Sequence, residues 1–111
     1  MAVALLNQKM KRHTEALDQA NRLVNQHPDK ALAYAVRAGI EHERGMLELA
    51  LYDYEQAIKR DSQNAEYHIY KVETLIDLKR FDEALQELNQ LTKMGVARAE
   101  LAELYKRCKQ R

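Results

Sequence analysis

The side chains of this sequence that could carry chemistry are four histidines, one cysteine and a pair of acids beside one histidine. Glu41 and Glu43 flank His42 but point to different faces of a helix, which does not suit a general acid–base pair. Neither a glycine-rich phosphate loop nor a His-Glu-x-x-His motif is present. The histidines lie far apart in the sequence, which disfavours a metal site; they are His13, His27, His42 and His68. We therefore expect no enzyme activity, no metal and no cofactor.

The composition narrows the classes of partner. The chain of 111 residues carries 18 Lys and Arg against 17 Asp and Glu, a formal net charge of +1. Without a strong field of one sign, nucleic acid is not expected as a partner. The opening apolar run is too short for a secretory signal, and no stretch is long enough to span a membrane. A single cysteine fits a reducing compartment, so we expect a cytoplasmic protein that binds neither nucleic acid nor membrane.

The residues 31–64 predict two amphipathic helices joined by a tight turn at Gly45, and their pattern recurs every 34 residues. Glycine is favoured at that turn because it enters the left-handed conformation at little cost. A fixed period of this size indicates stacked supersecondary units rather than one folded-over core. The recurring columns are Ala16, Ala50 and Ala84; Leu17, Leu51 and Leu85; and Leu23, Ala57 and Leu91.

This repeat resembles the tetratricopeptide repeat (TPR) family. The resemblance implies an all-α fold, a right-handed superhelical stack of antiparallel helix pairs with a capping helix. The single domain would comprise repeats at about residues 1–30, 31–64 and 65–95 and a capping helix at about 97–109. The residues that carry the resemblance are Tyr34, Ala38, Gly45, Ala50, Tyr54 and Ala57 in the central repeat, Phe81 and Ala84 in the next, and Ala4, Ala16 and Pro28 in the first.

Capping and turn residues place the helix ends. Thr14, Asp29 and Asn64 are predicted N-caps, and Gly95 is predicted to end the helix before the capping helix. The expected helices cover residues 2–10, 14–26, 30–44, 47–60, 65–78, 81–93 and 97–109, with a turn over 11–13.

The predicted capping helix carries its apolar residues on one stripe. Because Cys108 belongs to this stripe, a buried packing thiol is favoured over a nucleophile. Tyr34, Tyr54 and Tyr105 also fall at packing positions, whereas Tyr70 does not. The stripe residues are Leu101, Leu104, Tyr105 and Cys108.

Two charged residues stand where the resembled family usually has leucine in the first helix of a repeat. They are Arg37 and Lys71, and an acid lies 16 residues after each. We predict the ion pairs Arg37–Asp53 and Lys71–Glu87 between the two helices of each repeat. Arginine offers a planar fork to the carboxylate, so the first pair should be the stronger.

In the resembled family the first helices of the pairs line a concave groove. The bulky Ile69, Tyr70 and Ile76 fall outside the packing columns and should form an apolar patch there. Gly39 has two interpretations, room for a ligand or relief of a helix–helix contact. The same phase also places Leu32 and His42 on this side. The predicted groove residues are Leu5, Val36, Gly39, Glu43, Ile69, Tyr70, Glu73, Ile76 and Asp77.

The resemblance implies a non-enzymatic protein–protein interaction scaffold that binds a peptide or helix of a partner in this groove. Glu73 and Asp77 would select a basic group on that partner. A subgroup of the family binds terminal carboxylates with a ring of Lys, Asn and Arg, and these faces lack that ring. The alternative is a structural self-association module, either a homo-oligomer such as a homodimer or one segment of a larger assembly.

Overall fold

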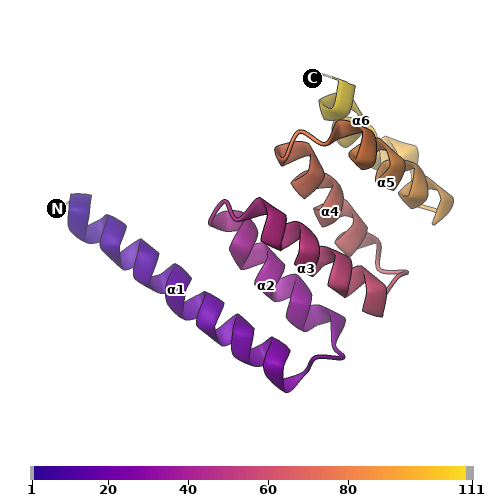
Figure 1. Cartoon of the computed structure of the whole chain (residues 1–111). Helices are drawn as coiled ribbons and strands as arrows, with labels where there is room; N and C mark the ends of the chain where they lie inside the picture. The colour runs from indigo at the N-terminus through magenta and orange to yellow at the C-terminus, as the bar shows by residue number, and fades with distance from the viewer. Residues whose placement is uncertain (1, 110–111) are drawn as a thin grey trace.

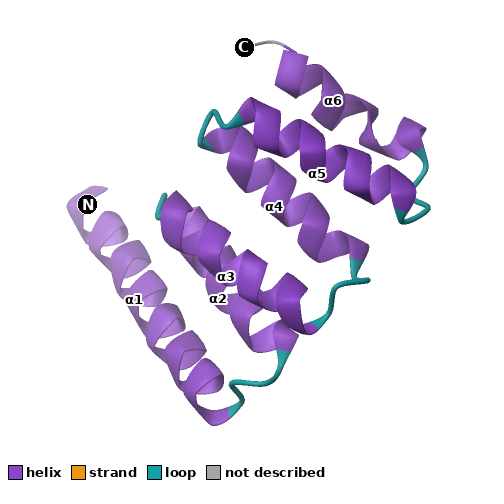
Figure 2. Cartoon of the chain, turned by 45° about the vertical axis from the view of Figure 1, so that its right-hand side comes forward, coloured by secondary structure: helices purple, strands orange, loops and turns teal. Residues whose placement is uncertain are grey.

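The chain is a single stack of helices in the computed structural model, which describes the backbone of residues 2–109 and the side chains of residues 14–109. Figure 1 shows the helices following one another from α1 at one end to α6 at the other. Short loops join them, and no strand occurs in the described chain (Figure 2). The architecture is the predicted all-α superhelical stack. The elements are α1 (Ala2–Gln26), α2 (Ala31–Glu43), α3 (Leu47–Arg60), α4 (Ala65–Asp77), α5 (Phe81–Lys93), the 3-10 helix η1 (Arg98–Leu101) and α6 (Ala102–Lys109).

Left-handed residues end α2, α4 and α5. Between α2 and α3, Gly45 has φ +78°. There the Met46 amide donates to the Glu41 carbonyl at 2.8 Å and closes the end of α2. Gly95 likewise ends α5, with φ +101°. The turn between α4 and α5 instead places Lys79 at φ 61°, a conformation that costs a non-glycine residue ~1–2 kcal/mol.

The first predicted helix pair is wrong. Residues 2–26 form one continuous helix, α1, rather than two helices with a turn over residues 11–13. Lys11 and Arg12 are good helix formers, and this stretch contains neither glycine nor proline to stop the helix. Thr14 therefore lies inside α1 and is not an N-cap. Although α1 has 25 residues, no helix of the described chain is both long and apolar enough to cross a membrane.

The predicted caps have different outcomes. Asn64 caps α4, because its Oδ1 accepts from the Glu66 amide at 3.0 Å. Asp29 does not cap α2: the N-cap is Lys30, whose side chain makes no capping hydrogen bond. The helix begins one residue later than predicted, which leaves Asp29 outside the capping position. The last helix begins as the 3-10 turn η1 before it continues as α6.

Small residues fill the contacts between helices, as the repeat columns predict. Ala38, Ala50, Ala57 and Ala84 have no exposed surface, so neighbouring backbones approach closely. Burial of Cys108 confirms its predicted place in the packing stripe of the last helix. The largest core cluster lies where α4, α5 and α6 meet, and it includes Leu75, Leu88, Leu91, Leu101, Tyr105 and Cys108.

Candidate functional site

An apolar surface lies on α2 and α4, the first helices of the two pairs. Leu32 and Val36 lie one turn apart on α2, with 64% and 39% of their surface exposed. Tyr70 on α4 is 41% exposed. Large apolar side chains are usually buried, so those left exposed on the first helices of consecutive pairs are candidates for an interaction site. We call the surface formed by Leu32, Val36 and Tyr70 the α2–α4 face.

Tyr70 is held in place by a second tyrosine. Its ring stacks on Tyr54 of α3, with centroids 5.6 Å apart and an interplanar angle of 30°. Tyr54 is buried, and this burial raises the pKa of its hydroxyl to about 12. One face of the Tyr70 ring therefore rests on a fixed, uncharged platform. Because the ring is pre-positioned, a ligand that stacks on it loses less entropy on binding.

Gly39 leaves a gap next to this tyrosine pair. A Cβ at position 39 would meet only the Tyr54 Oη, at 3.9 Å, which is ordinary van der Waals contact. Close helix packing therefore does not require a glycine here. Of its two interpretations, the relief of a helix–helix contact has no support in the geometry.

Ile76 is not part of any exposed patch, so its predicted place in the groove is wrong. It is 7% exposed and belongs to the core cluster with Leu51 and Val72. Ile69 is half-buried and packs against the same cluster. The physical reason is the capping helix, which packs on α4 and covers the position that the repeat phase assigns to the groove. Leu5 lies outside the residues whose side chains the structure describes.

The charged groove residues are in unequal surroundings. Asp77 Oδ2 lies 2.8 Å from His42 Nε2, and Asp77 Oδ1 lies 3.4 Å from Arg107 of α6. The Asp77 carboxylate is therefore already occupied from both sides, by α2 and by α6. Glu73 is half-buried, and no side chain in the described part of the chain pairs with it. Glu43 is exposed at the end of α2.

Both predicted ion pairs are present. Arg37 reaches Asp53 through two parallel bonds, Nε to Oδ2 and Nη2 to Oδ1, each 2.8 Å long. Asp53 is 1% exposed, so this bidentate pair joins α2 to α3 within the stack. Lys71 Nζ lies 3.5 Å from Glu87 Oε2 and joins α4 to α5. As predicted, the arginine pair has the better geometry.

The repeat pattern did not predict Glu41, which lies beside the arginine pair. This carboxyl is 5% exposed, and its Oε1 has no hydrogen-bond partner. The pKa of Glu41 is raised to about 8, mainly by burial of the carboxyl and secondly by a hydrogen bond to Asp53. The positive charge of Arg37 opposes this shift. Glu41 therefore keeps its proton at neutral pH. The repeat period could have predicted this burial, because the residue 34 positions after Glu41 is the apolar Leu75, which is buried.

His68 is also a packing residue that the sequence left unassigned. Its Nδ1 bonds the Glu87 carboxylate, and its Nε2 lies 2.8 Å from the Ser62 carbonyl oxygen. The ring is 6% exposed and ties the loop before α4 to α5. It lies apart from His42, which pairs with Asp77. Among the described side chains, no group of three His, Cys, Asp or Glu residues is arranged to hold a metal ion.

Comparison with known proteins agrees with this geometry. The TPR domain of Arabidopsis OM64 superposes with a TM-score of 0.78 at 18% identity, covering 93% of this chain and 85% of that one. The TPR2B domain of yeast Sti1, in its pHsp70 complex, gives a TM-score of 0.81 at 21% identity, with coverage of 92% and 86%. Yersinia enterocolitica SycD, in complex with a peptide of the translocator YopD, gives 0.72 at 16% identity, with coverage of 98% and 83%.

These structural matches establish the common fold. A search of curated protein sequences found no match. The family model for the tetratricopeptide repeat matches residues 41–108, which are more than half of the chain and run from the end of α2 through α3, α4 and α5 into α6. The chain belongs to the tetratricopeptide repeat family.

Proposed function

We propose that this chain is a non-enzymatic scaffold that binds an extended segment or a helix of a partner protein across the α2–α4 face. The observation that carries the proposal is the exposure of Leu32, Val36 and Tyr70 on the first helices of consecutive pairs. Two similar structures, those of yeast Sti1 and Yersinia SycD, are described as complexes with protein or peptide partners. We infer the same class of activity here.

Apolar contact would supply most of the affinity. Aromatic residues that rest on a rigid support are typical anchors of protein interfaces, and Tyr70 on Tyr54 has this arrangement. The gap at Gly39 lets a partner backbone approach the tyrosine pair. Val36 and Leu32 would extend the contact along α2, so a partner segment with apolar residues spaced along one side fits best.

Charge would then tune selectivity. Glu73 lies one turn beyond Ile69 and Tyr70 on α4 and has no cation beside it in the described chain, so it can receive a basic side chain of the partner. Asp77 is a weaker candidate because His42 and Arg107 already hold it. This division refines the predicted role of the two acids.

Recognition of a terminal carboxylate is not part of the proposal. The corresponding positions of this face carry Ala35, Gly39 and Tyr70, where the carboxylate-binding subgroup of the family has cationic and amide side chains. A cytoplasmic location remains a prediction from the single cysteine, as do the expectations that the chain binds neither nucleic acid nor membrane.

The test is a capture experiment with three baits from a native extract. The baits are the wild-type chain, Tyr70→Ala and the matched control Tyr52→Ala, which removes a 58% exposed tyrosine from α3. A protein retained by the wild type and by Tyr52→Ala but lost with Tyr70→Ala would support the proposal. Loss with Tyr52→Ala alone would move the binding site to α3 and overturn it.

Self-association is the second candidate function. It is favoured by Leu49 and Tyr52, which lie one turn apart on α3 and are 49% and 58% exposed. A symmetric dimer would bring these side chains of two copies together. Light scattering over a range of concentrations distinguishes the candidates, since a dimer that Tyr52→Ala abolishes would favour the structural role.

A further inference from the structure

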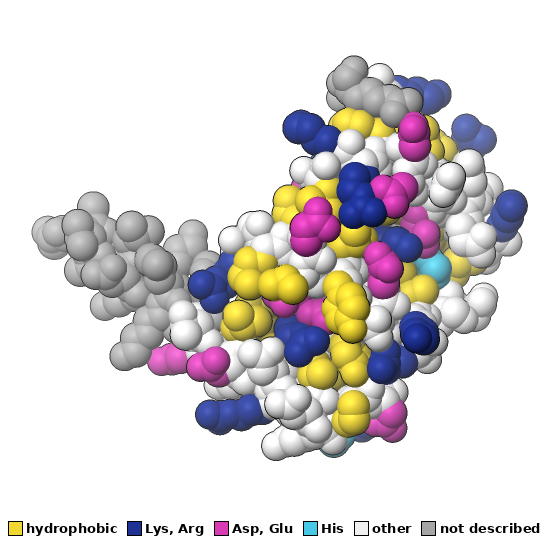
Figure 3. Space-filling view, viewed as in Figure 1, with side chains coloured by type: hydrophobic (Ala, Val, Ile, Leu, Met, Phe, Trp, Pro, Cys, Tyr) yellow, Lys and Arg dark blue, Asp and Glu magenta, His cyan; other side chains and the backbone are white. Residues whose placement is uncertain are grey.

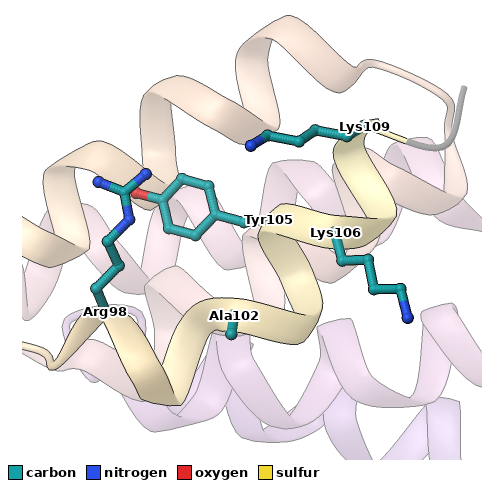
Figure 4. Close-up of a pocket in the computed structure, with 5 residues that line it drawn as sticks. All are labelled: Arg98, Ala102, Tyr105, Lys106 and Lys109. Atoms are coloured by element: carbon teal, nitrogen blue, oxygen red, sulfur yellow. The ribbon is translucent and has the colours of Figure 1, made fainter.

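We propose that this chain has a second binding site, a cationic pocket on α6 that takes an acidic segment of a partner protein. The pocket has a volume of about 410 Å³ and is lined by Arg98, Ala102, Tyr105, Lys106 and Lys109 (Figure 4). It is separate from the α2–α4 face. Arg107 of the same helix turns toward α4 and pairs with Asp77, whereas residues 98, 102, 105 and 109 follow the opposite side of the helix.

The pocket carries a local charge that the chain as a whole does not have. Three of its five lining residues are cations and none is an acid, although the net charge of the full sequence is only +1. No acidic side chain of the described chain pairs with Arg98, Lys106 or Lys109. Positive charge in a concave site without internal compensation attracts anions and raises their local concentration.

Arg98 is fixed in a position that suits a carboxylate. Its guanidinium lies 4.7 Å from the centre of the Tyr105 ring. Tyr105 is itself anchored, because its hydroxyl donates to Asn89 Oδ1 at 3.0 Å. A guanidinium attracted to the face of an aromatic ring still has five N–H groups with which it can donate to a carboxylate. The arginine is thus pre-organised before a ligand arrives, which lowers the entropy cost of binding.

A purely structural role explains only part of this pocket. Lys106 and Lys109 lie in the last turn of α6, where cations stabilise the negative end of the helix dipole. Arg98 lies at the opposite end, at the start of η1, where a cation gains nothing from the dipole. Its contact with the Tyr105 ring gives it a structural role of its own, but this contact does not neutralise its charge, and a bound anion would.

The arrangement of the cations favours an acidic protein segment over other anions. Figure 4 shows Arg98 and Lys109 directed toward the Tyr105 ring, whereas the Lys106 amine points away from them. Two carboxylates spaced along a peptide can meet these two positions. A second copy of the chain docked by the same pocket would bring like charges together. On the face of the molecule seen in Figure 3, basic and acidic side chains are interspersed, so no continuous basic track for a phosphate backbone crosses that face.

The experiment uses a fluorescent hexaglutamate peptide as the probe and fluorescence anisotropy as the measurement. The test variant is Lys106→Gln/Lys109→Gln, which changes two exposed side chains without touching the stack of Arg98 on Tyr105. The matched control is Lys30→Gln/Arg44→Gln, which removes the same charge from exposed positions on either side of α2. We expect the test variant to weaken binding roughly tenfold, as the loss of charge-assisted contacts implies, and the control to weaken it less than about twofold.

Two further variants sharpen the result. Arg98→Lys keeps the charge but loses the planar fork, so it should also weaken binding of the hexaglutamate peptide. Tyr70→Ala should leave the affinity for this peptide unchanged, because the α2–α4 face is a different site. Equal weakening by the test and control variants would overturn the proposal, since net charge alone would then explain binding. Equal binding of a hexaglutamine peptide, or tighter binding of a hexathymidylate, would overturn it as well.

Discussion

The buried Glu41 makes the stability of this fold depend on pH. Its pKa is raised from an ordinary value of 4.5 to about 8, mainly because the carboxyl is buried. A group whose pKa is raised on folding contributes stability that is fully present below its unfolded pKa. That contribution is lost as the pH rises toward the folded pKa, because the unfolded chain then releases a proton that the folded chain retains. The free energy of unfolding should therefore fall between about pH 5 and pH 8.

The magnitude follows from the size of the shift. One pKa unit corresponds to ~1.4 kcal/mol, so the full shift sets an upper limit of ~5 kcal/mol. Relaxation of the folded chain and water entry around an ionised carboxylate reduce it, and we expect a loss of ~1–3 kcal/mol in the free energy of unfolding across this range.

The perturbation that isolates this effect is Glu41→Gln. Glutamine has the same shape, cannot ionise, and its amide can still donate to Asp53 as the protonated acid does. Urea unfolding at pH 5, 7 and 9 should show wild type and variant close in stability at pH 5 and the variant more stable by ~1–3 kcal/mol at pH 9. The control is Glu55→Gln, which removes an exposed acid from α3. If the Glu41→Gln variant keeps the pH dependence of the wild type, the burial argument is refuted.

Three further substitutions test the packing. Arg37→Leu should cost ~3–5 kcal/mol, measured by urea unfolding, because it leaves Asp53 charged and buried without its partner; a loss below 1 kcal/mol would contradict the pairing. Lys79→Gly should raise the free energy of unfolding by ~0.5–1 kcal/mol, since it relieves the left-handed backbone at φ 61°, and a lower melting temperature would show that the turn is not strained. Ala50→Leu should cost ~1–3 kcal/mol by overpacking the contact between α2 and α3, and an unchanged melting temperature would show that the column has been placed wrongly.

The stack could be predicted from the sequence because small residues and turn glycines repeat with a fixed period. Ala50 and Ala84 occupy equivalent contacts in the two pairs and are fully buried. Gly45 ends its helix in the left-handed conformation that its position predicts. The pairing of Arg37 with Asp53 was also visible, because a charge at a packing position demands an opposite charge on the facing helix.

The remaining features depend on tertiary contacts that periodicity does not report. The repeat period places Ile76 among the groove positions, but the capping helix covers its side chain. Lys79 adopts a left-handed turn although no glycine signals one. The continuity of α1 reflects the absence of a helix breaker, whereas the repeat phase alone predicts a turn. The protonated state of Glu41 follows from burial next to Asp53, which a single sequence does not show.

The measurement that tests the central proposal most directly is a calorimetric titration of a captured partner into the wild type, Tyr70→Ala and Tyr52→Ala. All three proteins must first show the same helical content and melting temperature, so that a change in affinity reports the surface and not the fold. We predict that Tyr70→Ala weakens binding by ~1–3 kcal/mol, the range for an aromatic anchor, while Tyr52→Ala leaves it unchanged. Unchanged affinity in Tyr70→Ala together with weaker binding in Tyr52→Ala would contradict the proposal that partners bind the α2–α4 face.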